Sequence, residues 1–238
     1  MKNLNYKEPK KDKIINGFYD MRKNTPLLLK KSHSNIIFKI TEENKDVHEI
    51  LYIKSIINDD STALIGNEFK NPYLENPQAV DLTYIYFSKD DYFANMYLYD
   101  LKKSVKLQKT ILDLVCQLNS SFSNANNLIE SCGEYKEIKT IIGVITENND
   151  KDYQKKEIDM LQQKLADRNQ IENDTSLPSF MRYAYKAKNN SNLGIIYNIL
   201  SDFYYGKIKI NGVDYNIDVI VMDNSTYTMV FNDGVLKK

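Results

Sequence analysis

The sequence predicts an α/β fold: a central mixed β-sheet flanked by helices, with a β-rich C-terminal extension. Two neighbouring segments, 79–87 and 96–103, are rich in β-branched and aromatic residues and are separated by polar ones, which is typical of paired strands. An amphipathic helix pattern follows over Ser104–Ser131, and a third apolar segment over Ile138–Glu147 reads as another strand. Strands alternating with helices favour an α/β fold.

Length and composition indicate one globular unit. The chain has 238 residues, of which 42% are hydrophobic, enough to build a sizeable core. We expect a disordered basic arm over 1–12 and a single α/β domain over 13–238, with its core at about 60–150 and its extension at about 175–238. No run of 18 apolar residues predicts a membrane span, and the start of the chain has no apolar signal segment. A cytoplasmic location is therefore expected.

Net charge is zero, but the charge is uneven along the chain. Residues 1–31 hold nine Lys and Arg residues against three acids. The favoured interpretation is a solvated, partly disordered tail. The alternative is an arm that contacts phosphates, because each phosphate neutralised by a lysine adds salt-dependent affinity for nucleic acid.

Elements before the two central strands are predicted from local patterns. Segments Ser34–Ile40 and His48–Ile57 are apolar and β-branched, which favours strands, although a helix remains open for the second. Residues Ser61–Lys70 fit a short helix with Ser61 as its N-cap. Segment 71–78 contains two prolines and is typical of a loop.

Elements after the central strands follow from periodicity and turn signals. Apolar residues at spacings of three and four make Ser104–Ser131 the clearest helix. Tyr153–Glu172 reads as a surface helix, because its apolar residues are sparse, and Asn192–Tyr205 as a third. The chain ends with a predicted β-hairpin whose strands Lys207–Ile210 and Val213–Met222 flank an Asn-Gly type I′ turn, followed by a strand at Tyr227–Phe231.

Charged residues on the two central strands predict a site that could bind a metal ion. Asp100 and Lys102 are two residues apart, so on a strand both side chains point to the same face. If the two segments pair as a hairpin, Asp81 lies near Asp100. Two carboxylates and an ammonium group at one sheet edge suit a divalent cation and an oriented water molecule. Tyrosines 84, 86, 97 and 99 alternate in the opposite phase, which favours packing on the other sheet face over base stacking.

This arrangement resembles the PD-(D/E)xK nuclease superfamily, whose signature is an acid on one strand and acid-x-Lys on the next. The resemblance covers roughly residues 60–150, with Asp81 followed by Asp100-Leu101-Lys102. Position 80 is Val where many members have Pro, and position 100 is Asp where Glu is commoner. The resemblance implies catalytic roles for Asp81, Asp100 and Lys102, with Glu68 as an additional acid. It also implies Mg²⁺ or Mn²⁺ held by Asp81, Asp100 and the backbone carbonyl of Leu101.

Two functions follow as expectations. The favoured one is a metal-dependent nuclease acting on DNA or RNA, with DNA as the favoured partner, in a restriction, phage-defence or mobile-element setting that the family suggests. The alternative is a non-catalytic interaction protein, a subunit or inhibitor of a defence complex, that uses the same core as a scaffold. A nuclease requires Asp81, Asp100 and Lys102 to converge at an open cleft, whereas in a scaffold they would splay or be occluded.

Overall fold

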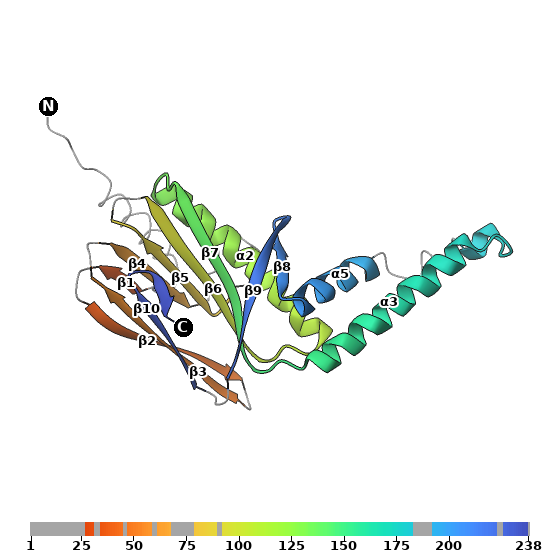
Figure 1. The fold of residues 1–238 in the computed structure, drawn as a ribbon, viewed down its shortest axis with the longest axis horizontal. Helices are drawn as coiled ribbons and strands as arrows, with labels where there is room; N and C mark the ends of the chain where they lie inside the picture. The colour runs from red at the N-terminus through yellow and green to blue at the C-terminus, as the bar shows by residue number, and fades with distance from the viewer. Residues whose placement is uncertain are drawn as a thin grey trace.

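The computed structural model describes residues 27–30, 34–44, 47–58, 61–67, 79–89, 92–182, 192–222 and 226–237. Within these residues the protein is a mixed α/β structure with two mixed sheets (Figure 1). The predicted N-terminal arm over 1–12 and the predicted acid Glu68 lie outside the described residues.

The elements occur in the following order. The first strands are β1 (Leu27–Lys30), β2 (Ser34–Asn44), β3 (Val47–Ile57), β4 (Thr62–Asn67), β5 (Leu82–Phe87) and β6 (Phe93–Ser104). Next come α2 (Gln108–Cys132), β7 (Glu137–Asn148), α3 (Lys151–Asn173) and α5 (Leu193–Tyr204). The chain ends with β8 (Lys207–Ile210), β9 (Val213–Val221), β10 (Thr226–Asn232) and β11 (Val235–Lys237).

The seven-stranded sheet contains the two strands that carry the predicted acids. Its order is β1-β4-β5-β6-β7-β9-β8, and β5 and β6 are antiparallel neighbours with Leu82 opposite Tyr99. Helix α2 follows β6 and packs on the sheet, and β7 then returns parallel to β6. The structure confirms that the two acid-bearing strands pair. It also confirms the predicted helix packed across them, α2, and the predicted third strand, β7.

Alternation along β5 and β6 separates two cores. Ile85 and Leu98 belong to the core that contains residues of α2 and α5, whereas Tyr84, Tyr97 and Tyr99 belong to the core shared with the four-stranded sheet, whose order is β11-β10-β3-β2. The predicted packing of the tyrosines is confirmed: the Tyr84 ring stacks on Phe231 of β10 with centroids 4.0 Å apart. The expectation that helices flank the sheet holds for one face only, because the tyrosine face is covered by the second sheet.

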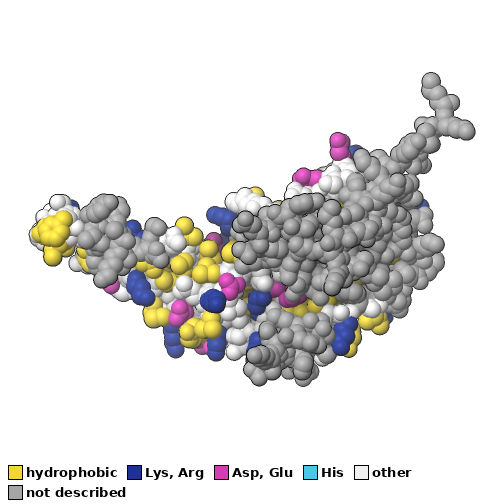
Figure 2. Space-filling view, turned by 180° about the vertical axis from the view of Figure 1, so that it is seen from behind, with side chains coloured by type: hydrophobic (Ala, Val, Ile, Leu, Met, Phe, Trp, Pro, Cys, Tyr) yellow, Lys and Arg dark blue, Asp and Glu magenta, His cyan; other side chains and the backbone are white. Residues whose placement is uncertain are grey.

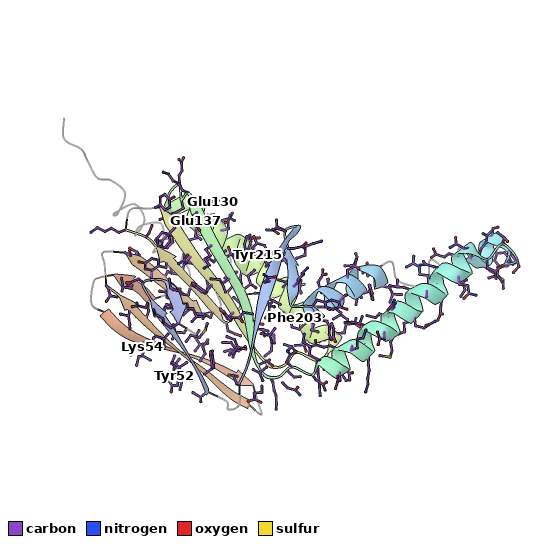
Figure 3. All side chains as sticks on the ribbon, in the orientation of Figure 1. Tyr52, Lys54, Glu130, Glu137, Phe203 and Tyr215 are labelled. Carbon is purple, nitrogen blue, oxygen red and sulfur yellow. The ribbon has the colours of Figure 1, made fainter. Side chains whose placement is uncertain are left out.

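The outer face of the second sheet also alternates. Leu51 and Ile53 of β3 are fully buried, while Tyr52 and Lys54 between them are only partly buried. Figure 3 shows Tyr52 and Lys54 on the side of this sheet away from the helices. The second sheet therefore packs on the first through one apolar face, and its other face is more accessible to solvent.

The predicted helix at Ser61–Lys70 is wrong for its described part, because residues 62–67 form strand β4. Ala63, Leu64 and Ile65 are all fully buried, and β4 pairs with β1 on one side and β5 on the other. A surface helix would bury only one stripe of such a run, whereas an inner strand buries both faces. Helix α2 also begins later than predicted, at Gln108, because β6 continues to Ser104.

The C-terminal third adds strands to both sheets. The predicted hairpin between β8 and β9 is confirmed, with Asn211 and Gly212 both at positive φ in the turn. Strand β9 also pairs with β7, in parallel, so this hairpin forms one end of the central sheet. The predicted strand over Tyr227–Phe231 is β10, and it pairs in parallel with β3 in the second sheet.

Helix α3 extends away from the sheets as an arm, with α5 alongside its first half (Figure 1). A hydrogen bond joins the first turn of α3 to the end of α5, because Lys151 Nζ donates to the Tyr204 carbonyl over 2.7 Å. Phe180 and Met181 follow α3 and are 70% and 50% exposed, and Figure 2 shows apolar side chains at the tip of the arm. Among the described residues, no helix is both long and apolar enough to cross a membrane.

Replacing Gly234 with alanine is expected to lower the free energy of unfolding by about 2 to 3 kcal/mol, through backbone strain and overpacking. Gly234 has φ +72°, and an added Cβ would lie 2.2 Å from Cγ of the buried Tyr86 ring. Gly212→Ala is the matched control, since its φ is +83° but no atom of the described part of the chain lies within 4 Å of the added Cβ. Urea denaturation of both variants measures the difference, and equal losses would contradict the steric account.

Candidate functional site

Strands β5 and β6 bring Asp81 and Asp100 together. Asp81 directly precedes β5, and the register that places Leu82 opposite Tyr99 places Asp81 opposite Asp100. The Asp81 carboxylate is fixed there, because its Oδ2 accepts a hydrogen bond from the backbone N–H of Leu101 over 2.7 Å. Asp100 lies in the second half of β6, next to Val144 of β7, and its side chain is completely buried.

Lys102 completes the cluster from the same face of β6. Its Nζ lies 2.5 Å from Asp100 Oδ2, and its side chain is 18% exposed. Three of the four predicted catalytic residues, Asp81, Asp100 and Lys102, therefore lie side by side at the end of β6. The structure does not describe the fourth, Glu68.

Burial and charge act in opposite directions on Asp100. Burial raises its pKa well above the ordinary value, the nearby Asp81 carboxylate raises it further, and the Lys102 ammonium lowers it. Desolvation disfavours the charged form of a carboxyl group, and a like charge within a few ångströms has the same effect. Asp100 therefore holds a proton more readily than an ordinary carboxyl group, and a further positive charge beside it would weaken that tendency.

The donor set at this cluster fits a hard divalent cation. Neither carboxylate oxygen of Asp100 makes a hydrogen bond of regular geometry in the described part of the chain, so its contact with Lys102 is an ion pair. Buried carboxylate oxygens with unused acceptor capacity are suited to bind a metal. Among the described residues, no group of three or more Asp, Glu, His or Cys side chains is placed so that it could hold a metal ion. A cation here would hence have two protein carboxylates, which suits Mg²⁺ because it retains several waters.

Helix α2 places a buried polar side chain against the segment that leads into β5, which the sequence interpretation did not identify. Ser121 is fully buried, and its Oγ accepts a hydrogen bond from the Val80 N–H, one residue before Asp81, over 2.9 Å. Asn124, one turn away, is 2% exposed, and its Nδ2 has no hydrogen-bond partner among the residues that the structure describes. Both positions fall within the apolar stripe of the helix, and a polar residue at a stripe position is the signal that could have revealed them.

The cluster is closed to solvent at its centre. Asp100 is wholly buried and Lys102 is largely so, which differs from the open cleft expected of a nuclease. Two acids at another end of the central sheet are exposed. Figure 3 shows Glu130 of α2 and Glu137 of β7 at the end of this sheet that lies far from β9 and α5. Those acids are separate from the Asp81–Asp100 pair. The pair is thus a defined internal cluster of charged groups.

Comparison with known proteins gives no further guidance: no family model, no curated protein and no solved structure matches this chain. The functional interpretation therefore depends on the cluster itself. Two carboxylates and an ammonium group can bind a divalent cation, orient a water molecule and neutralise charge on a phosphate.

Proposed function

We propose that this protein is a metal-dependent nuclease that hydrolyses phosphodiester bonds of DNA or RNA, with DNA as the favoured substrate and the cytoplasm as its location. The observation that supports this proposal is the placement of Asp81, Asp100 and Lys102 on one face of two neighbouring strands. The helix after the second strand and the parallel strand β7 agree with the order of elements that the PD-(D/E)xK resemblance implies.

Each residue has a role in this proposal. The carboxylates of Asp81 and Asp100, with the carbonyl oxygen of Leu101, would hold Mg²⁺ or Mn²⁺. When bound, the cation supplies an acidified water molecule and neutralises charge at the phosphate. Lys102 lies next to the carboxylates, where its ammonium group can donate hydrogen bonds to the attacking water or to a phosphate oxygen.

A second function is favoured by the burial of Asp100. A fully buried carboxylate paired with Lys102 is also consistent with a structural ion pair in a non-catalytic interaction protein, such as a subunit or inhibitor of a defence complex. The exposed Phe180 and Met181 at the tip of the arm are in keeping with a protein partner.

The test of the proposed function is a cleavage assay with Mg²⁺ or Mn²⁺ on supercoiled plasmid, linear duplex DNA, single-stranded DNA and RNA. We expect cleavage of at least one substrate and full inhibition by a chelator. Cleavage that persists in the chelator would exclude the metal-dependent mechanism. No cleavage of any substrate over a broad pH range would instead favour the interaction protein.

Deletion of residues 1–13 is expected to weaken nucleic-acid binding and to flatten its dependence on salt. The segment contains Lys2, Lys7, Lys10, Lys11 and Lys13, and each lysine that neutralises a phosphate increases the salt slope by about one unit. Fluorescence anisotropy at several salt concentrations measures the slope for the full chain and the truncated chain. Identical slopes would show that this segment does not contact phosphates.

A further inference from the structure

Helix α2 contributes one buried hydroxyl group that bonds outside the helix. Ser131 Oγ donates to the Asn127 carbonyl of α2 over 2.7 Å, while the partly buried Ser123 Oγ donates to the Asn119 carbonyl over 3.0 Å and accepts from Asn211 Nδ2 in an exposed contact. Ser121 Oγ instead accepts from the Val80 N–H, which belongs to the segment leading into β5. Ser121 is also fully buried, at a stripe position where an apolar side chain or alanine would suit the core.

Two hydrogen bonds then fix Asp81 from both sides. Ser121 holds the N–H of Val80, the residue whose carbonyl forms the peptide bond to Asp81. The Asp81 carboxylate in turn accepts from the N–H of Leu101, the residue after Asp100. The helix, the start of β5 and the end of β6 are therefore connected through the Val80–Asp81 segment.

We propose that Ser121 is a positioning residue that sets the Asp81 carboxylate relative to Asp100. This proposal rests on the proposed metal site, since the purpose of the arrangement is to keep two mutually repelling carboxylates at a separation that suits one cation. Without the hydroxyl, the buried Val80 N–H has no acceptor, and the Val80–Asp81 peptide shifts to find one. Asp81 then moves away from both Leu101 and Asp100.

Amide hydrogen exchange tests the positioning role without reference to activity. Ser121→Ala is expected to accelerate exchange of the Leu101 N–H at least tenfold, because that N–H is protected by the Asp81 carboxylate. The amide of Ile142, within β7, serves as an internal reference for global stability. Ser131→Ala is the matched control, since it removes a hydroxyl from the same helix that bonds only within the helix. Unchanged Leu101 protection in Ser121→Ala would overturn the proposal.

The dependence of the melting temperature on Mn²⁺ concentration distinguishes a positioning role of Ser121 from a purely structural one. We expect the Mn²⁺ concentration that gives half of the maximal rise in melting temperature to increase about tenfold in Ser121→Ala, and to stay unchanged in Ser131→Ala. Ser121→Cys serves as a second variant of nearly the same shape with a weak acceptor, and it should behave like alanine. A lower melting temperature with an unaltered Mn²⁺ midpoint would overturn the positioning role. Absence of any Mn²⁺ response in the wild type would contradict the proposed function, while the Leu101 exchange rate would still decide the role of Ser121.

Discussion

Replacing Asp100 with alanine is expected to lower metal-dependent cleavage by about a hundredfold or more, which corresponds to roughly 3 kcal/mol or more of lost transition-state stabilisation. Asp100 is the central group of the cluster, paired with Lys102 and placed opposite Asp81. Asp81→Ala and Lys102→Ala should have effects of similar size, since each removes one of the groups that bind the cation or contact the phosphate. Initial rates of plasmid cleavage at saturating Mn²⁺ measure all three.

Two exposed neighbours provide controls for this loss. Asp113 of α2 and Lys103 of β6 carry the same charges as the catalytic candidates but lie on the surface. Their alanine variants should cleave at the wild-type rate. The two Asp→Ala variants at the cluster should remain folded, because removal of one acid relieves the repulsion between the carboxylates. When Asp100 is removed, Lys102 can turn its ammonium group to solvent, since its side chain is already 18% exposed. If Asp100→Ala cleaved at the wild-type rate, the cluster would not be the catalytic site.

Replacing Lys102 with methionine is expected to destabilise the fold by about 3 to 5 kcal/mol at pH 8, because it leaves a buried carboxylate without its cation. The loss should diminish as pH falls toward 4. The folded-state pKa of Asp100 is already raised above the unfolded value, and Lys102 is the group that lowers it, so the methionine variant raises it further. A raised carboxyl pKa gives stability that is present below the unfolded pKa and is lost as pH rises through the folded pKa.

Urea denaturation at pH 4, 6 and 8 measures this dependence. The double variant Asp100→Asn with Lys102→Met should recover most of the lost stability at pH 8, since it buries no net charge. Lys103→Met is the control, because Lys103 is adjacent in sequence and exposed. A loss of equal size at all three pH values would show that Lys102 contributes through packing alone.

Local patterns were sufficient for the elements that create the site. The sequence correctly predicted that the tyrosines lie on the opposite face of β6 from Asp100 and Lys102, because side chains alternate strictly along a strand. The apolar stripe of α2 and the Asn-Gly turn at 211–212 were equally reliable, since both are set by residues close in sequence. Those local rules placed Asp81 and Asp100 on neighbouring strands.

Long-range partners were beyond such patterns. The apolar run in β4 fits a buried helix or a buried strand, and only its pairing with β1 and β5 decides between them. The parallel pairing of β10 with β3 joins segments more than 170 residues apart, which no local pattern indicates. The burial of Asp100 and the hydrogen bond from the Val80 N–H to Ser121 Oγ likewise arise from tertiary packing.

Titration of the protein with Mn²⁺ by isothermal calorimetry tests the central claim most directly, because it needs no knowledge of the substrate. We predict one binding site per chain in the wild type, a release of protons on binding that reflects the raised pKa of Asp100, and no binding to Asp81→Asn or Asp100→Asn. A wild-type protein that binds no Mn²⁺, or variants that bind it as tightly as the wild type, would contradict the assignment of Asp81 and Asp100 as a metal site.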